Sequence, residues 1–165
     1  MIVLVMGVAG VGKSTIGAAL ARNLGWRFID ADDYHPPENV SKMKAGIPLE
    51  DADRWPWLSR LNFELRKLEQ AVLACSALKA SYRQRLSEGI PDFRTVYLRG
   101  SFDVVDSRMK TRSHRFMPAA LLESQFAALE PPANAISIDV AATPDDCVAA
   151  ILRELRKKKP GMSRA

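Results

Sequence analysis

A glycine-rich segment at residues 7–14 constrains this 165-residue chain more than any other feature. The segment reads Gly7, Val8, Ala9, Gly10, Val11, Gly12, Lys13 and Ser14, which fits the pattern G-x-x-x-x-G-K-[ST]. It follows an apolar run at residues 2–6 and precedes a helical pattern at residues 13–24. A strand, a glycine loop and a helix in this order predict a phosphate-binding loop.

Each part of the loop has a physical role in binding a polyphosphate. Glycines let successive backbone N–H groups converge on phosphate oxygens. The helix that starts near Lys13 adds the positive end of its dipole. Lys13 is expected to reach the β- and γ-phosphates of ATP, and the Ser14 hydroxyl to ligate Mg²⁺. The predicted nucleotide-binding stretch therefore runs from Gly7 to Thr15.

Composition excludes several classes of protein. Hydrophobic residues make up 47% of the chain and charged residues 26%, which suits one globular domain and argues against disorder. The two cysteines are too few for a disulfide framework and lack zinc-site spacing to a histidine. The apolar N-terminus is far shorter than the ~20 residues of a bilayer span. We expect a cytoplasmic protein with no membrane partner, with a single domain at residues 1–158 and a basic tail at residues 159–165.

Apolar runs and helical patterns alternate along the chain. Strands are predicted at residues 2–6, 26–29, 71–75, 95–98 and 136–140. Helices are predicted at residues 13–24, 37–45, about 55–68, 79–87, 102–112, 119–129 and 144–157. Because parallel neighbours need crossover connections, this alternation predicts the α/β class with a five-stranded parallel sheet.

An acidic cluster follows the second predicted strand. Asp30 and Asp32 are one residue apart, so on an extended segment both would point to the same side and Asp33 would face away. Phosphoryl transfer to a hydroxyl uses one carboxylate that accepts or orients the hydroxyl and another near the metal. The third predicted strand ends in Cys75 and Ser76 without an acidic residue. A carboxylate near the metal must therefore come from another segment, which favours a functional role for Asp30 and Asp32. The other interpretation is an acidic turn that caps the following helix.

Phosphate binding alone does not specify a reaction, because kinases, motor ATPases and GTPases share this loop. The chain is barely larger than a minimal five-stranded core and has no Asn-Lys-x-Asp motif for guanine. Both observations favour a kinase that acts on a small molecule.

Beyond the loop, a series of blocks resembles the gluconate kinases. The blocks are residues 7–15, D-A-D-D-Y-H-P at 30–36, Asn39, Lys42-Met43, G-I-P-L at 46–49, D-A-D-R-W-P-W-L at 51–58, C-S-A-L-K at 75–79, Tyr82-Arg83, F-M-P at 116–118, Leu122, S-Q-F at 124–126 and L-E-P-P at 129–132. They cover nearly the whole chain in order, and the blocks at 51–58 and 75–79 are much narrower signals than the loop.

The resemblance implies a three-layer, nucleoside-monophosphate-kinase-like fold with a mobile lid, assembled as a homodimer. It also implies a Mg²⁺-dependent transfer of the γ-phosphoryl group of ATP to the 6-hydroxyl of D-gluconate. By this resemblance Lys13 and Asp32 are catalytic, and Asp30 lies near the metal together with Ser14.

Substrate contacts are also implied by the resemblance. They are Asp32, His35, Arg54, Lys79, Arg115 and Gln125. Arg54 suits the carboxylate of a sugar acid, because a guanidinium pairs with it bidentately; its alternative is a surface ion pair with Asp51 or Asp53. His35 could instead hydrogen-bond a loop carbonyl, and Lys79 could equally well be solvated.

A lid is expected at about residues 112–128, where arginines would close over the phosphates and exclude water. Its cations would be Arg108 and Arg112, which are also predicted nucleotide contacts, and Arg115. The family has Gly-His directly before Phe-Met-Pro, whereas this chain has an arginine there and His114 one position earlier.

Two other functions stay open. A related kinase for another small sugar acid or alcohol, such as shikimate, would use the same pair of aspartates. A nucleotide-dependent nucleic-acid-binding protein would suit the net charge of +5. The basic residues are spread over several segments, however, and no aromatic-rich strand pair offers base stacking, so we expect no nucleic-acid partner.

Overall fold

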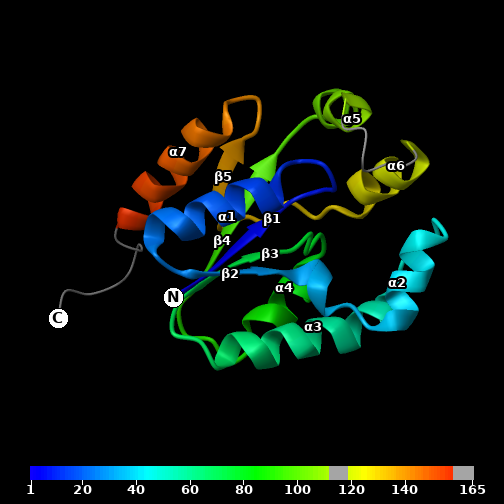
Figure 1. The fold of residues 1–165 in the computed structure, drawn as a ribbon, viewed down its shortest axis with the longest axis horizontal. Helices are drawn as coiled ribbons and strands as arrows, with labels where there is room; N and C mark the ends of the chain where they lie inside the picture. The colour runs from blue at the N-terminus through cyan, green and yellow to red at the C-terminus, as the bar shows by residue number, and fades with distance from the viewer. Residues whose placement is uncertain (112–118, 158–165) are drawn as a thin grey trace.

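The computed structural model describes residues 1–111 and 119–157, and five parallel strands form one sheet at the centre of this part (Figure 1). The strands are β1 (Ile2–Met6), β2 (Arg27–Asp30), β3 (Ala71–Ala74), β4 (Phe93–Arg99) and β5 (Ile136–Asp139). They lie in the order β2-β3-β1-β4-β5, and every neighbouring pair is parallel. The predicted α/β class with a five-stranded parallel sheet is confirmed.

Helices cover both faces of the sheet and so form three layers (Figure 1). They are α1 (Lys13–Leu24), α2 (Pro37–Lys44), α3 (Asp51–Arg66), α4 (Ala80–Ser87), α5 (Phe102–Thr111), α6 (Ala119–Ala128) and α7 (Pro144–Arg156). A 3₁₀ turn, η1 (Ala31–Tyr34), follows β2. Helices α1 and α7 pack together on one face, and α3 and α4 pack together on the other. No described helix has the length and apolar composition that a membrane crossing requires.

The central strand β1 is buried along its whole length. Val3 and Val5 pack into the cluster beneath α1 and α7, whereas Leu4 packs with the core of α3 and α4. Alternate side chains of a strand point to opposite faces, so a strand covered on both sides has no polar position. This burial explains the unbroken apolar run before the glycine loop.

The order of the strands reverses at β1. The chain runs from β1 to β2 on one side, whereas β4 and β5 lie on the other side. Ligands of open α/β sheets bind at such a switch point, beyond the carboxyl ends of the strands. Val5 and Asp30 both lie opposite Ala74 in the sheet register, so the end of β2 is level with the start of the glycine loop.

Some boundaries differ from those predicted. The helix predicted from about residue 55 begins at Asp51, because Asp53 Oδ2 accepts the Glu50 N–H at 2.9 Å and caps the first turn. Strand β4 extends beyond the predicted residues 95–98, and five of its residues, beginning at Phe93, pair with β1. The spacing of apolar residues indicates which positions are buried. It therefore does not indicate the polar cap of α3 or the partly buried end of β4. The single domain stays a prediction; residues 112–118 of the predicted lid and the basic tail at residues 159–165 lie outside the described residues.

A buried asparagine joins α3 to the end of α4. Asn62 is 1% exposed, and its amide nitrogen donates to the carbonyl oxygens of Leu86 at 2.9 Å and of Glu88 at 2.8 Å. Both hydrogens of the amide group are therefore used to satisfy the carboxyl end of a neighbouring helix, where carbonyls have no helical partner.

Replacing Asn62 with alanine is expected to lower the free energy of unfolding by about 1–3 kcal/mol, because both carbonyl groups lose their donor. Urea denaturation followed by far-UV circular dichroism measures the change. The control is Gln84→Ala, at an exposed position of α4, which is expected to stay within about 0.5 kcal/mol of the unchanged protein. Equal stability of the two variants would contradict the role given to Asn62.

Candidate active site

The loop between β1 and α1 has the backbone conformation that its motif predicts. Gly12 directly precedes α1 with a φ of 107°, in the left-handed region that favours glycine. Gly7 is needed for close packing, because a Cβ there would lie 2.9 Å from the carbonyl oxygen of Leu98 on β4. The loop is thereby held against the sheet, and the first N–H groups of α1 form an anion-binding end.

Side chains from two directions reach the loop backbone. Lys13 folds across the loop, and its Nζ donates to the Val8 carbonyl oxygen at 2.9 Å. From α6, the Gln125 Oε1 atom accepts the Ala9 N–H at 2.7 Å. This second contact brings the described part of the predicted lid against the phosphate loop.

The aspartates after β2 lie beside the loop, but not on an extended segment. Asp32 lies in the 3₁₀ turn η1, and its N–H donates to Asp30 Oδ1 at 3.0 Å. The other oxygen of Asp30 accepts the Ser14 hydroxyl at 2.9 Å. The prediction of an extended D-x-D segment is therefore wrong. Asp30 caps the 3₁₀ turn, whereas the helix predicted at residues 37–45 has no side-chain cap. Asp30 nevertheless bridges the turn to the first residues of α1.

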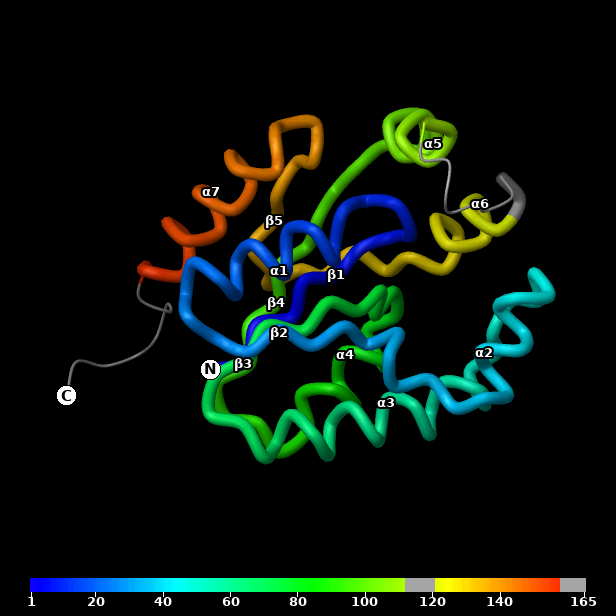
Figure 2. The backbone as a smooth tube through the Cα atoms, viewed as in Figure 1, coloured from blue at the N-terminus to red at the C-terminus, as the bar shows by residue number. Residues whose placement is uncertain are grey.

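One cleft of about 550 Å³ gathers most of the predicted site residues. Its lining contains Ala9, Gly10, Gly12, Lys13, Ser14, Thr15, Asp30, Asp32, His35, Arg54 and Gln125. Helix α2 and the following loop lie across from α6 at this end of the molecule (Figure 2). Residues from α2, from the loop and from α6 line the cleft. Sequence reasoning did not assign a role to the wall formed by residues 46–49, although that block belongs to the family resemblance.

His35 is held on the cleft wall by stacking and by a hydrogen bond. Its ring lies 4.0 Å from that of Trp57 at an interplanar angle of 16°, and its side chain is 3% exposed. Nδ1 lies 3.2 Å from the Asn39 amide nitrogen, and Nε2 lies 3.8 Å from Asp32 Oδ1. Burial lowers the pKa of His35, the nearby Asp32 carboxylate opposes this shift, and the Arg54 guanidinium adds to it. The imidazole is therefore neutral at physiological pH.

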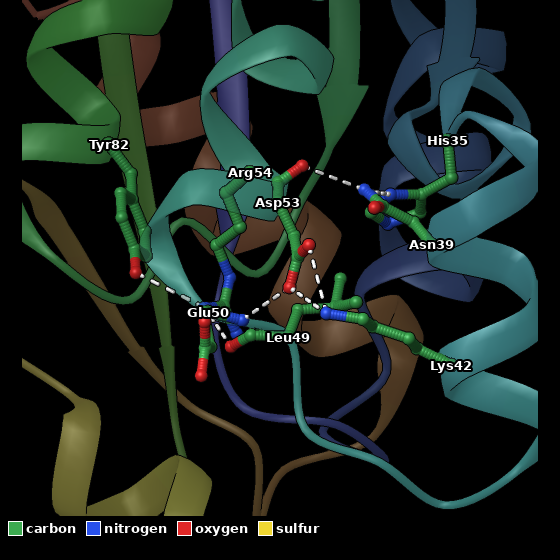
Figure 3. A network of polar contacts seen from close by, with 8 residues as sticks. All are labelled: His35, Asn39, Lys42, Leu49, Glu50, Asp53, Arg54 and Tyr82. Carbon is green, nitrogen blue, oxygen red and sulfur yellow. Dashed lines mark hydrogen bonds and ion pairs between the residues drawn. The ribbon is translucent and has the colours of Figure 1, made fainter.

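The Arg54 side chain is positioned by groups on two other segments (Figure 3). Its Nη1 donates to the Leu49 carbonyl oxygen and to the Tyr82 hydroxyl, the latter at 3.3 Å. Tyr82 in turn donates to Asp51, and this hydrogen bond is the main reason that the pKa of Asp51 is lowered. Asp53 pairs with Lys42 at 2.9 Å. Both aspartates near Arg54 thus have other partners, and Arg54 lines the cleft.

Lys79 lies outside the cleft lining. Its Nζ lies 3.2 Å from Asp51 Oδ1, and it precedes α4 instead of lying on it. Arg83 likewise serves the backbone, since it donates to the carbonyl oxygens of Ala77, Leu78 and Glu130. Of the predicted substrate contacts among the described residues, Lys79 is the one that the fold does not bring to the cleft.

A second cavity, of about 330 Å³, adjoins the loop on the side of β5. Its lining includes Val11, Thr15, Arg108 and the segment after β5. Arg108 Nη2 donates to the Val140 carbonyl oxygen at the start of that segment. Arg112 and Arg115 lie outside the described residues.

Cys75, at the end of β3, also lines the cleft. Burial raises the pKa of its thiol to about 12, so the group is neutral at physiological pH. This strand end supplies no anionic group, and the acidic residues in the cleft lining are the two after β2, Asp30 and Asp32.

Comparison with known proteins agrees with this geometry. A family model described as shikimate kinase matches residues 9–130. A probable gluconokinase of Mus musculus is 45% identical, over 94% of this chain and 97% of the mouse protein. The thermosensitive gluconokinase of Escherichia coli K12 is 43% identical, over 90% of this chain and 86% of its own length.

A solved structure gives the same assignment. The crystal structure of a gluconokinase from Sinorhizobium meliloti 1021 superposes with a TM-score of 0.88 at 44% identity, and covers 93% of this chain and 90% of that one. Sequence identity of 44% over nearly the full length is evidence of membership in the same family, whereas a similar fold alone is not. The chain belongs to the gluconokinase family, within the wider group that the shikimate kinase model describes.

Proposed function

We propose that the protein transfers the γ-phosphoryl group of ATP to the 6-hydroxyl of D-gluconate, giving 6-phospho-D-gluconate and ADP. The observation that carries the proposal is one cleft in which a phosphate loop faces a carboxylate, Asp32, and a cationic side chain, Arg54. The relatives with 43–45% identity bear the name gluconokinase. A shikimate-type acceptor is the second candidate, because the matching family model has that description.

The nucleotide is proposed to bind with its phosphates on residues 7–15 and its base in the second cavity. The N–H groups of the loop and of the first turn of α1 suit the phosphate oxygens. Lys13 supplies a positive charge for the β- and γ-phosphates. Arg108 lines the second cavity, and Arg112 and Arg115 are proposed to complete the cationic contacts from the lid.

Ser14 and Asp30 are proposed to hold Mg²⁺, with Asp30 acting through water. A hydroxyl and a carboxylate are the hard oxygen ligands that this ion prefers, and the two oxygens already lie 2.9 Å apart. When bound, the ion would neutralise charge on the β- and γ-phosphates.

Asp32 is proposed to accept the proton of the acceptor hydroxyl. The hydroxyl oxygen forms a bond to the γ-phosphorus, the bond from this phosphorus to the bridging oxygen of ADP breaks, and the hydroxyl proton passes to the carboxylate. His35 and Gln125 line the same cleft and are proposed to contact the sugar hydroxyls. Lys79 would act at longer range, through its ion pair with Asp51.

Arg54 is proposed to bind the carboxylate of gluconate. Its Nη1 is engaged by Leu49 and Tyr82, which restrains the guanidinium, and Nη2 and Nε are proposed to face the substrate. A fixed guanidinium edge matches the two oxygens of a carboxylate. From the family resemblance we further propose a cytoplasmic homodimer.

Asp32→Asn is expected to lower kcat for gluconate-dependent formation of ADP by about a hundredfold or more, because the amide cannot take the hydroxyl proton. A coupled assay with Mg²⁺ and ATP measures it, with D-gluconate and shikimate compared as acceptors. The control is Asp33→Asn, an exposed neighbour outside the cleft lining, which is expected to keep full activity. Turnover with shikimate and none with gluconate would replace the proposed acceptor.

Arg54→Ala is expected to raise KM for gluconate roughly 10- to 100-fold, as the loss of hydrogen bonds to a charged group predicts. KM for ATP should change little, because the nucleotide phosphates are proposed to lie on the glycine loop. Arg60→Ala is the matched control: this exposed arginine of α3 lies over the ring of Tyr34 and does not line the cleft. A rise in KM for ATP equal to that for gluconate would contradict the role given to Arg54.

A further inference from the structure

Asn39, in the first turn of α2, is the other buried polar residue of the described chain besides Asn62. It is 2% exposed, and its amide nitrogen lies 2.9 Å from the Asp53 carbonyl oxygen and 3.2 Å from His35 Nδ1 (Figure 3). It does not line the cleft. Its contacts nevertheless determine which ring nitrogen of His35, a residue of the cleft lining, donates a hydrogen bond and which accepts one.

The orientation of the Asn39 amide follows from its two neighbours. A backbone carbonyl oxygen only accepts, so the group that faces Asp53 must be the NH₂ and not the amide oxygen. An NH₂ group has two hydrogens and no lone pair to share. Its second hydrogen therefore points to His35 Nδ1, which must act as the acceptor.

The Asp53 carbonyl is itself well anchored. The Asp53 carboxylate accepts two hydrogen bonds from Lys42, at 2.9 and 3.1 Å, and the N–H of Glu50 at 2.9 Å. Lys42 belongs to α2 and Asp53 to α3, so the helix that carries Asn39 is joined to α3 by an ion pair. The amide is thus held from both sides, and its flipped orientation would place two oxygens in contact.

A neutral imidazole whose Nδ1 accepts a hydrogen bond carries its single proton on Nε2. This nitrogen faces Asp32 Oδ1 at 3.8 Å, which is too long for a hydrogen bond. Every fully buried side-chain nitrogen and oxygen of the described residues has a hydrogen-bond partner. Nε2 has no hydrogen bond at 3.8 Å, so it is not fully buried, and we infer that it is the atom of His35 that reaches the cleft. The charged groups that act on the ring are the Asp32 carboxylate and the Arg54 guanidinium.

We propose that Asn39 is a positioning residue that fixes His35 as the Nε2–H tautomer, so that the ring directs a hydrogen-bond donor toward Asp32 and the substrate oxygens. The part played by this donor in phosphoryl transfer rests on the function proposed above; the tautomer itself does not. His35 is then unable to take a proton from the acceptor hydroxyl, and Asp32 alone performs that step. The Nε2–H group is instead available to donate to a substrate oxygen beside Asp32.

The first test is the tautomer in the unchanged protein. Imidazole ¹⁵N NMR separates a protonated from an unprotonated ring nitrogen, and the chain has two histidines, so the disappearance of one set of signals in His35→Gln identifies this ring. We expect Nε2 protonated and Nδ1 unprotonated above the pKa of the ring. Because burial lowers this pKa, the neutral form should persist below pH 6.5. A protonated Nδ1 in the neutral ring would overturn the proposal.

The second test compares Asn39→Ala with Asn62→Ala, since each variant deletes two hydrogen bonds from a buried asparagine. Asn39→Ala is expected to populate both tautomers and to lower kcat about tenfold, by analogy with the loss of the hydrogen-bond partners that orient metal-ligating histidines. Asn62→Ala is expected to lose similar stability with the tautomer and kcat unchanged. A single Nε2–H tautomer in Asn39→Ala would overturn the proposal.

An error in the proposed function and an error in the role of Asn39 would give different experimental results. If gluconate does not stimulate turnover in the unchanged protein, the proposed function is wrong, whereas the NMR result still decides the tautomer. If gluconate is phosphorylated and Asn39→Ala keeps kcat within twofold, the assignment of Asn39 as a positioning residue is wrong.

Discussion

The first turn of α1 has backbone N–H groups that no helical carbonyl can satisfy, and the rest of the molecule is arranged around them. They gain a polyphosphate partner only if the preceding loop folds tightly, which requires glycine at positions 7 and 12. They also need a fixed place at the centre of the sheet edge, which requires β1 to be buried between β3 and β4. The apolar run and the glycine motif are therefore two consequences of one constraint.

The two halves of the cleft are built on different principles. The phosphate side depends on the backbone conformation of the glycine loop, to which Gly7 and Gly12 contribute. The acceptor side depends on side-chain hydrogen bonds, with Asp53 joined to Lys42, Glu50 and Asn39. Since each of these bonds requires a particular residue type, the acceptor side is where substitutions are expected to change specificity.

The sequence predicted features that depend on local pattern and missed those that depend on contacts across the chain. Buried strands and the phosphate loop have local signatures, so their positions were correct within a few residues. The prediction of an extended arrangement of Asp30 and Asp32 was wrong, because residues 31–34 form a 3₁₀ helix that Asp30 caps through the Asp32 N–H. Asn39 was visible only as part of a family block, since its contact with Asp53 joins residues fourteen positions apart and leaves no periodic trace.

The contacts around Arg54 explain why its positive charge can bind a substrate although Asp51 and Asp53 are close to it in sequence. Asp51 is engaged by Tyr82 and Lys79, and Asp53 by Lys42, so neither neighbouring carboxylate is in an ion pair with the guanidinium among the described residues. A buried or half-buried cation without a fixed anionic partner favours an anionic ligand, because the ligand supplies the missing charge. The Asp32 carboxylate, in contrast, faces a neutral imidazole at 3.8 Å. A substrate with a carboxylate and a reactive hydroxyl satisfies both groups at once, and a neutral polyol satisfies only one.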